Sequence, residues 1–189
     1  QQAAQSSFNT VGVPLQPRRM WPSGLDQLMG ADAPRGRLSK GEQAEPGYAL
    51  ARLSDMGYGT RLRELLVTNE LGEPVDSEVP AELGRACVKV LATWEWAEAG
   101  RPVAVLKLPS PVRPRLAQSL GRGLASVGRL VDLGQVSLVG EPRFFGGNSA
   151  FRCADVLRSY RVPAEVLDYV HEHRCPVLLV SDAVDSRWA

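Results

Sequence analysis

The sequence predicts an α/β fold, with helices flanking a partial parallel sheet and a small, mostly helical module in front of it. Two almost wholly apolar runs carry this prediction, at 103–108 (VAVLKL) and 177–180 (VLLV). Runs of this length suit strands that are buried on both faces, as parallel strands are. A third run, 130–139 (LVDLGQVSLV), alternates apolar and polar residues as a strand does. Helical spacing fills the intervals between these runs, and such alternation of helix and strand is typical of a parallel sheet.

The N-terminal part of the chain predicts an arm followed by a small module. Residues 1–16 are polar and irregular, so we expect a flexible arm. Residues 17–45 contain many glycines and prolines, which predict short turns and one short strand pair. Residues 46–69 predict two helical pieces separated by a GYG break. An acidic stretch with two prolines follows and is the expected linker. The predicted modules are therefore 17–75 and 76–189.

Helical spacing recurs through the second module. It predicts helices from Pro80 to about Ala99, from Pro114 onward and from Asn148 to about Ser159, and a short helical turn after Pro163. On the first of these helices Trp94 is expected in the core, with Trp96 nearly opposite it. The final strand is so apolar that we expect it inside the sheet, with the remaining strands supplied from elsewhere. The domain 76–189 is thus predicted to be incomplete.

Composition excludes several classes of protein. The chain has 189 residues, of which 44% are hydrophobic and 23% charged, values that exclude collagen, coiled coil and general disorder. Its apolar runs are too short to span a membrane, and its first ten residues do not resemble a signal peptide. It does not begin with Met, from which we expect a fragment of a longer protein. The three cysteines form no CxxC pair, which predicts free thiols and a reducing, cytoplasmic location.

Charge is unevenly distributed along the chain. No Asp or Glu occurs between Gly100 and Val131, although this stretch contains six cationic residues, and the segment before it is rich in acids. One interpretation is a face that binds phosphate, which makes Arg113, Arg115 and Arg122 candidate DNA contacts. The alternative is that these arginines pair with the preceding acidic segment.

The RRMWP run, residues 18–22, is a second candidate contact for DNA. Arg18 and Arg19 are cationic and Trp21 is aromatic, a combination that suits phosphate contact and base stacking on single-stranded DNA. The alternative is that Trp21 packs between the two modules, because large aromatic side chains are usually buried.

The C-terminal run VLLVSDAVDSRWA predicts a ligand site. Ligands of open α/β sheets bind just outside the carboxyl ends of the strands. There the carboxylates of Asp182 and Asp185 could accept hydrogen bonds from sugar hydroxyls or join a metal shell, and a loop containing Ser186 could wrap a phosphate. The alternative is a buried strand that ends in an ordinary Asx turn.

This run resembles the signature of type I phosphoribosyltransferases. In that signature, four apolar residues are followed by two acids, two more apolar residues, an Asp, and then Thr or Ser. Here Ser181 replaces the first acid and Arg187 replaces the next Gly. Two upstream segments, VAVLKLPSPVRPRLAQSLGRGLA and GGNSAFRCADVLRSYRV, resemble the ComF-like members of that family. The resemblance implies a degenerate phosphate and ribose site made of Asp182, Asp185, Ser186, Arg187, Ser110, Asn148 and Arg152.

The chain as a whole is similar to the C-terminal region of actinobacterial RecQ-like ATP-dependent DNA helicases. RRMWPSGL, RLSKGEQAEPGYALARLSDMGYGTRLRELL, VKVLATW and DSRW carry this similarity, which covers about residues 17–189. It implies a non-catalytic accessory region that binds DNA or a partner in repair and recombination, with the helicase core of the parent protein as a partner.

Motifs for independent catalysis are missing from the sequence. It contains no GxxxxGK[ST] loop, no DExH-type acid box and no zinc motif, since HEHRC (171–175) lacks zinc-ligand spacing. We therefore expect ATP and Mg²⁺ to belong to the parent motor, and no cofactor or metal in this chain. The alternative function is an active or ligand-sensing type I phosphoribosyltransferase that binds phosphoribosyl pyrophosphate with Mg²⁺.

Overall fold

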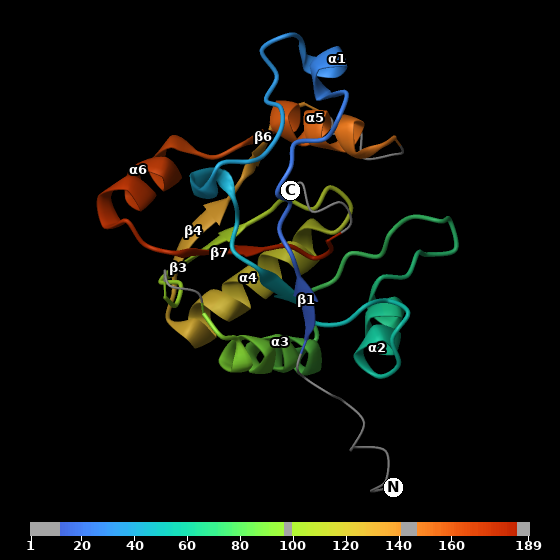
Figure 1. Cartoon of the computed structure of the whole chain (residues 1–189). Helices are drawn as coiled ribbons and strands as arrows, with labels where there is room; N and C mark the ends of the chain where they lie inside the picture. Colours follow the sequence, from blue (N-terminus) through green and yellow to red (C-terminus); the bar gives the residue numbers. More distant parts are fainter. Residues whose placement is uncertain (1–11, 97–99, 141–146, 185–189) are drawn as a thin grey trace, which may run out of the picture.

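A parallel sheet of three strands organises the structure, which is a computed structural model describing residues 12–96, 100–140 and 147–184. The strands are β3 (Ala104–Lys107), β4 (Val131–Gln135) and β7 (Val177–Val180), in the order β4-β3-β7. Both pairings are parallel, as the sequence predicts. Figure 1 shows helices packed around this sheet, so the mixed α/β class is confirmed.

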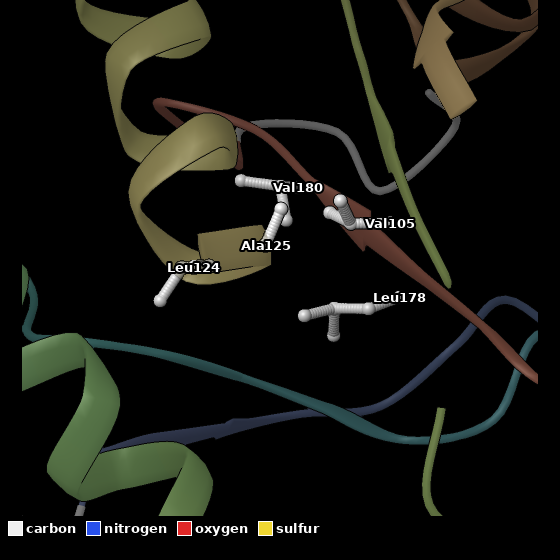
Figure 2. Close-up of a cluster of buried hydrophobic side chains, with 5 residues drawn as sticks. All are labelled: Val105, Leu124, Ala125, Leu178 and Val180. Carbon is white, nitrogen blue, oxygen red and sulfur yellow. The ribbon is translucent and has the colours of Figure 1, made fainter. Parts of the chain in front are cut away.

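One face of the sheet is covered by α4 (Pro114–Gly128). Apolar residues at helical spacing point from α4 to the sheet, and Figure 2 shows the resulting cluster, made of Val105, Leu124, Ala125, Leu178 and Val180. The opposite face is covered by α6 (Ala164–His173), through a cluster of Leu106, Val136 and Val166. The sequence predicts only a short turn after Pro163, and the structure corrects this to a full helix.

Strand β7 lies at the edge of the described sheet, not inside it. It pairs with β3 alone, whereas all four residues of β3 are buried and β3 is the central strand. Leu178 and Val180 are buried under α4, but the side chain of Leu179 is 51% exposed on the other face. An apolar run therefore does not distinguish a strand buried on both faces from one buried on a single face. The expectation that 177–180 is an inner strand is wrong for the described residues.

Helix α3 (Ala81–Thr93) packs on α4 and is shorter than predicted. It ends at Thr93, and the next three residues leave the helix. Trp94 and Trp96 therefore do not lie on opposite sides of a helix. Their rings stack with centroids 4.6 Å apart, and the edge of Tyr48 contacts Trp94 with a centroid distance of 5.0 Å. Extended backbone brings residues i and i+2 to the same side, which explains the stacking.

The N-terminal part forms small elements around the sheet domain. Strand β1 (Val13–Leu15) pairs antiparallel with β2 (Gly47–Ala49), so the end of the expected flexible arm 1–16 is structured, while residues 1–11 lie outside the described residues. The helix expected from residue 46 is wrong, because Gly47–Ala49 pairs with β1 and Met56 is 86% exposed. The second expected helical piece is confirmed as α2 (Tyr58–Leu65).

The remaining elements form a lobe beside the sheet. Helix α1 (Leu25–Met29) packs on α5 (Ser149–Ser159), with Leu25 buried against α5. A short 3₁₀ helix (η1) lies at Lys40–Glu42, and the predicted strand 130–139 divides, because its end forms β5 (Ser137–Leu138). Strand β5 pairs with β6 (Tyr160–Arg161) in a separate two-stranded sheet. The α1–α5 contact joins the two predicted modules; the boundary near residue 75 stays a prediction.

An ion pair between a buried lysine and an exposed aspartate links the central strand to its neighbour. The Lys107 ammonium lies 2.6 and 2.7 Å from the two carboxylate oxygens of Asp132 on β4, and the Lys107 side chain is only 7% exposed. Its stem crosses α4 at Gly121, where an added Cβ would lie 2.3 Å from the Lys107 Cγ, so glycine is required there. Burial acts to raise the pKa of Asp132, but hydrogen bonds from Lys107 and the Gly134 N–H, with the nearby cations, hold this pKa below its ordinary value.

We predict that Asp132→Asn lowers the free energy of unfolding by about 2 kcal/mol, because it removes the counter-ion of buried Lys107, while solvent screens the exposed Asp132 side of the pair. Urea denaturation of both proteins checks this value. Because the folded pKa of Asp132 is lowered, its contribution is complete above about pH 3.9, the ordinary aspartate pKa, and is lost as the pH falls through the folded value. Lys107→Met, which removes the charge itself, should be better tolerated than Asp132→Asn; equal losses would contradict this account.

Candidate functional site

The strand order creates a switch point between β3 and β7. The chain leaves β3 through α4 toward β4, and then crosses back through α6 to β7 on the far side of β3. The two crossovers lie on opposite faces, so the carboxyl ends of β3 and β7 mark the point where the chain switches from one face of the sheet to the other. Open α/β sheets bind their ligands at this position.

Ser110 and Asp182 meet at the switch point. Ser110 follows β3 and is 6% exposed, and Asp182 follows β7. The Ser110 hydroxyl donates to Asp182 Oδ2 at 2.8 Å and accepts from the Arg113 N–H at 3.0 Å. Burial raises the pKa of Tyr160, and the Asp182 carboxylate raises it further, so this phenol stays neutral and able to donate. A hydroxyl, a carboxylate and a phenol therefore gather here.

The structure brings together only part of the expected phosphate and ribose set. Ser110 and Asp182 are hydrogen-bonded, while Asp185, Ser186 and Arg187 lie outside the described residues. Asn148 and Arg152 belong to α5 in the lobe beside the sheet. There the Asn148 side chain accepts from the N–H groups of Ala150 and Phe151, at 2.9 and 3.3 Å. Asn148 is thus the N-cap of α5, a role that its sequence position also predicts.

A hollow of about 380 Å³ opens where the RRMWP run meets the start of α5. Arg18 and Trp21 reach it from one side and Asn148 from the other. The remaining lining residues are Met20, Pro22, Ser23, Ser149 and Ala150. Trp21 also packs against the cluster of Leu25, Cys153 and Ala154, so the alternative that it packs between the modules holds as well. Two candidate sites that are far apart in the sequence therefore share one surface.

The RRMWP run is half of a two-stranded ribbon. Trp21 N donates to Gly36 O at 2.8 Å and Leu38 N donates to Arg19 O at 3.0 Å, around a bridge between Met20 and Arg37. The predicted strand pair is thus present as a single bridge, which places exposed Arg37 opposite exposed Met20, the residue after Arg19. Arg37 is not among the residues predicted from the sequence. The signal for it was a second basic run, bounded by glycine and proline, that could pair with the RRMWP run. Between residues 17 and 40 the chain has five cationic and two acidic residues.

The cation-only stretch 100–131 does not form one face. Lys107 is buried, and Arg113 Nη2 donates to the carbonyl of Leu66 at 3.1 Å, which leaves Arg113 tied to the segment before α3. Asp76 accepts from the N–H groups of Arg115 and Leu116 at 2.9 and 3.1 Å, at the start of α4. Arg122 and Glu78 lie 3.9 Å apart, with both side chains largely exposed. Among the described residues, Arg122 is the one cation of the stretch that lies within ion-pair distance of an acid in the preceding segment, so the alternative holds for Arg122 alone. The DNA-binding roles of Arg113, Arg115 and Arg122 stay predictions.

The three cysteines are free thiols, as the sequence predicts. Burial raises the pKa of both Cys87 and Cys153 to about 11, so neither supplies a thiolate nucleophile at neutral pH. Among the described residues, no three His, Cys, Asp or Glu side chains gather as metal ligands, and no helix is long and apolar enough to cross a membrane.

Comparison of the chain with protein-family models, curated proteins and solved structures finds no match. The resemblances to phosphoribosyltransferases and to RecQ-like helicases therefore remain predictions drawn from sequence motifs.

We predict that Asn148→Ala lowers the free energy of unfolding by about 1 kcal/mol, because two N–H groups at the start of α5 lose their acceptor. Asn148→Asp should retain most of the stability, since a carboxylate caps equally well and favours the positive end of the helix dipole. Urea denaturation of the three proteins checks this order. If Asn148→Ala is as stable as the unmodified chain, the capping role is wrong.

Proposed function

We propose that this chain is a non-catalytic accessory region that binds single-stranded DNA, as expected for the C-terminal part of a RecQ-like helicase. The observation that carries the proposal is the hollow between the ribbon and α5, where Arg18 and Trp21 line one surface. Exposed Arg37 lies opposite Met20, which lines the hollow, and exposed Arg19 is the residue before Met20. Cations that contact phosphates next to an aromatic ring on which a base can stack are the usual components of sites for single strands.

The chemistry of the hollow favours binding over turnover. The hydroxyls of Ser23 and Ser149 can donate to phosphate oxygens, and Met20, 55% exposed, offers an apolar contact for a base. Neither His residue lies in the hollow lining, and neither does a carboxylate, so a general base is missing from these described residues. Attachment to DNA would position the helicase core of a parent protein, which would supply ATP, Mg²⁺ and translocation.

The test is a comparison of two matched double variants. Arg19→Ala/Arg37→Ala removes two cations beside the hollow, and Arg115→Ala/Arg122→Ala removes two from α4. We expect the first to lower the affinity for a fluorescent oligothymidylate and to reduce the slope of log K against log salt by about 1.4, since single strands give about 0.7 per phosphate contact. Anisotropy titrations at several salt concentrations measure both quantities.

The α4 variant should change the slope by less, because Arg122 lies near Glu78 and the start of α4 holds Asp76. If the two variants lose affinity and slope equally, binding is general attraction to positive charge. If Arg19→Ala/Arg37→Ala binds like the unmodified chain, the hollow is not the DNA site.

A second candidate function, a ligand-sensing phosphoribosyltransferase-like site, is favoured by one observation. The hydrogen-bonded pair of Ser110 and Asp182 lies at the switch point, where a ribose hydroxyl could replace Ser110 as the donor to the carboxylate. We expect the chain to bind phosphoribosyl pyrophosphate weakly, more tightly with Mg²⁺ than without it, and Asp182→Asn to abolish the heat of binding. Calorimetric titration with and without Mg²⁺ checks this, and unchanged heat from Asp182→Asn would rule out this site.

A further inference from the structure

An arginine precedes each strand of the parallel sheet by two or three residues. Ala104, the first residue of β3, is in register with Val131 of β4 and with Val177 of β7, so the three strands begin side by side at the amino-terminal edge. Arg101 and Arg174 stand three residues before Ala104 and Val177, and Arg129 stands two residues before Val131. The three arginines therefore form a row at this edge of the sheet. We name them the edge arginines.

The edge arginines direct their charge to solvent. All three are exposed. Among the described residues none of them forms an ion pair or a side-chain hydrogen bond, in contrast to Arg113, which binds a backbone carbonyl, and Arg122, which lies near Glu78. Their charges are therefore available to an external anion.

Two of the edge arginines adopt a backbone conformation that disfavours a side chain. Arg129 has φ 52° at the end of α4, and Arg174 has φ 46° at the end of α6. Elsewhere the described chain uses ten glycines for positive φ, and glycine is the usual residue after a helix end. The same chain places arginine at two such positions, both on one edge of the sheet. Residues held in disfavoured conformations cluster at functional sites, so this outlier motivates a functional hypothesis.

Helix electrostatics explains only part of this arrangement. A cation is favourable at the negative end of a helix dipole, which would account for Arg129 after α4 and for Arg174 after α6. It does not account for Arg101, eight residues beyond the end of α3 at Thr93, or for the presence of an arginine before every strand of the sheet. An external anion that spans the edge accounts for the whole row.

We propose that the edge arginines bind the sugar-phosphate backbone of a single nucleic-acid strand. A guanidinium binds phosphate oxygens through two parallel N–H donors, and a row of separate cations matches a polymer of phosphates better than one small anion. Trp94 and Leu130, the residue after Arg129, pack against the same core cluster, and Trp96 stacks on Trp94. Trp96 is half-buried and can stack with a base.

This surface is independent of the hollow beside α5. The edge arginines lie where the strands begin, and the hollow is formed by the ribbon and the start of α5. Three carboxylates near the edge arginines in sequence, Glu95, Asp132 and Glu172, are exposed. Asp132 is paired with Lys107, and the other two oppose anion binding. Neutralising Glu172 should therefore strengthen binding at the row, an effect that a purely structural role of the arginines would not produce.

The test uses the full chain and a fluorescent oligothymidylate in anisotropy titrations at several salt concentrations. We expect Arg129→Gly/Arg174→Gly to weaken binding roughly tenfold at low salt and to reduce the salt slope by about 1.4. Its thermal midpoint should stay unchanged or rise by about 2–4 °C, because glycine relieves the positive φ. Glu172→Gln should tighten binding. The matched control is Arg85→Ala/Lys89→Ala, which removes two exposed cations from α3.

Unchanged affinity and slope in Arg129→Gly/Arg174→Gly would overturn the proposal, as would an equal loss in the α3 control. If binding falls only in Arg19→Ala/Arg37→Ala, the hollow binds DNA and the edge arginines do not. If it falls only in the glycine variant, the edge arginines are the DNA site and the hollow is not. No binding by the unmodified chain would overturn both.

Discussion

The burial of β3 on both faces is the constraint on which the rest of the structure depends. Its four residues, Lys107 included, are buried, so a layer must cover each side of the strand. The chain achieves this by leaving β3 through α4 on one face and returning to β7 through α6 on the other. That path makes the carboxyl ends of β3 and β7 a switch point, and it places all three strand beginnings on the opposite edge. The Ser110–Asp182 pair and the edge arginines are consequences of this one topology.

The acidic segment before α3 acts as a structural strap, not as a linker free of contacts. Asp76 accepts from two N–H groups at the start of α4, where an acidic group offsets the helix dipole. Val79 N donates to the Ser119 hydroxyl at 2.8 Å, and Arg113 holds the carbonyl of Leu66 from the other direction. These contacts explain why a run of acids and a run of cations follow each other in the sequence. They attach the segment before α3 to the start of α4 through hydrogen bonds.

Sequence patterns predicted the layers of this fold better than the places of its edges. The runs that became β3 and β7, and the spacing that became α4, were recognisable because burial selects apolar residues at a fixed period. The position of β7 at the edge was not, since Leu179 is as apolar as a core residue although it is half exposed. The hollow between the RRMWP run and the start of α5 could not be predicted from the sequence either. It depends on the packing of α1 on α5, a contact between residues more than a hundred positions apart. Arg174 lies outside the cation-only stretch, and only the strand register brings it beside Arg101 and Arg129.

The net charge of +1 does not describe how charge is distributed over the surface. Several acids are engaged by other parts of the fold: Asp132 by buried Lys107, Asp76 by the start of α4, and Glu42 by the backbone and hydroxyl of Ser39. Of these partners only Lys107 is a cation, so the other carboxylates satisfy N–H and O–H donors without neutralising an arginine. The edge arginines, and Arg19 and Arg37 on the ribbon, then remain exposed, and few carboxylates contact them. Electrostatic attraction to a phosphate polymer depends on this local arrangement and acts over about 10 Å at 0.1 M salt, so a nearly neutral chain can still present two anion-binding surfaces.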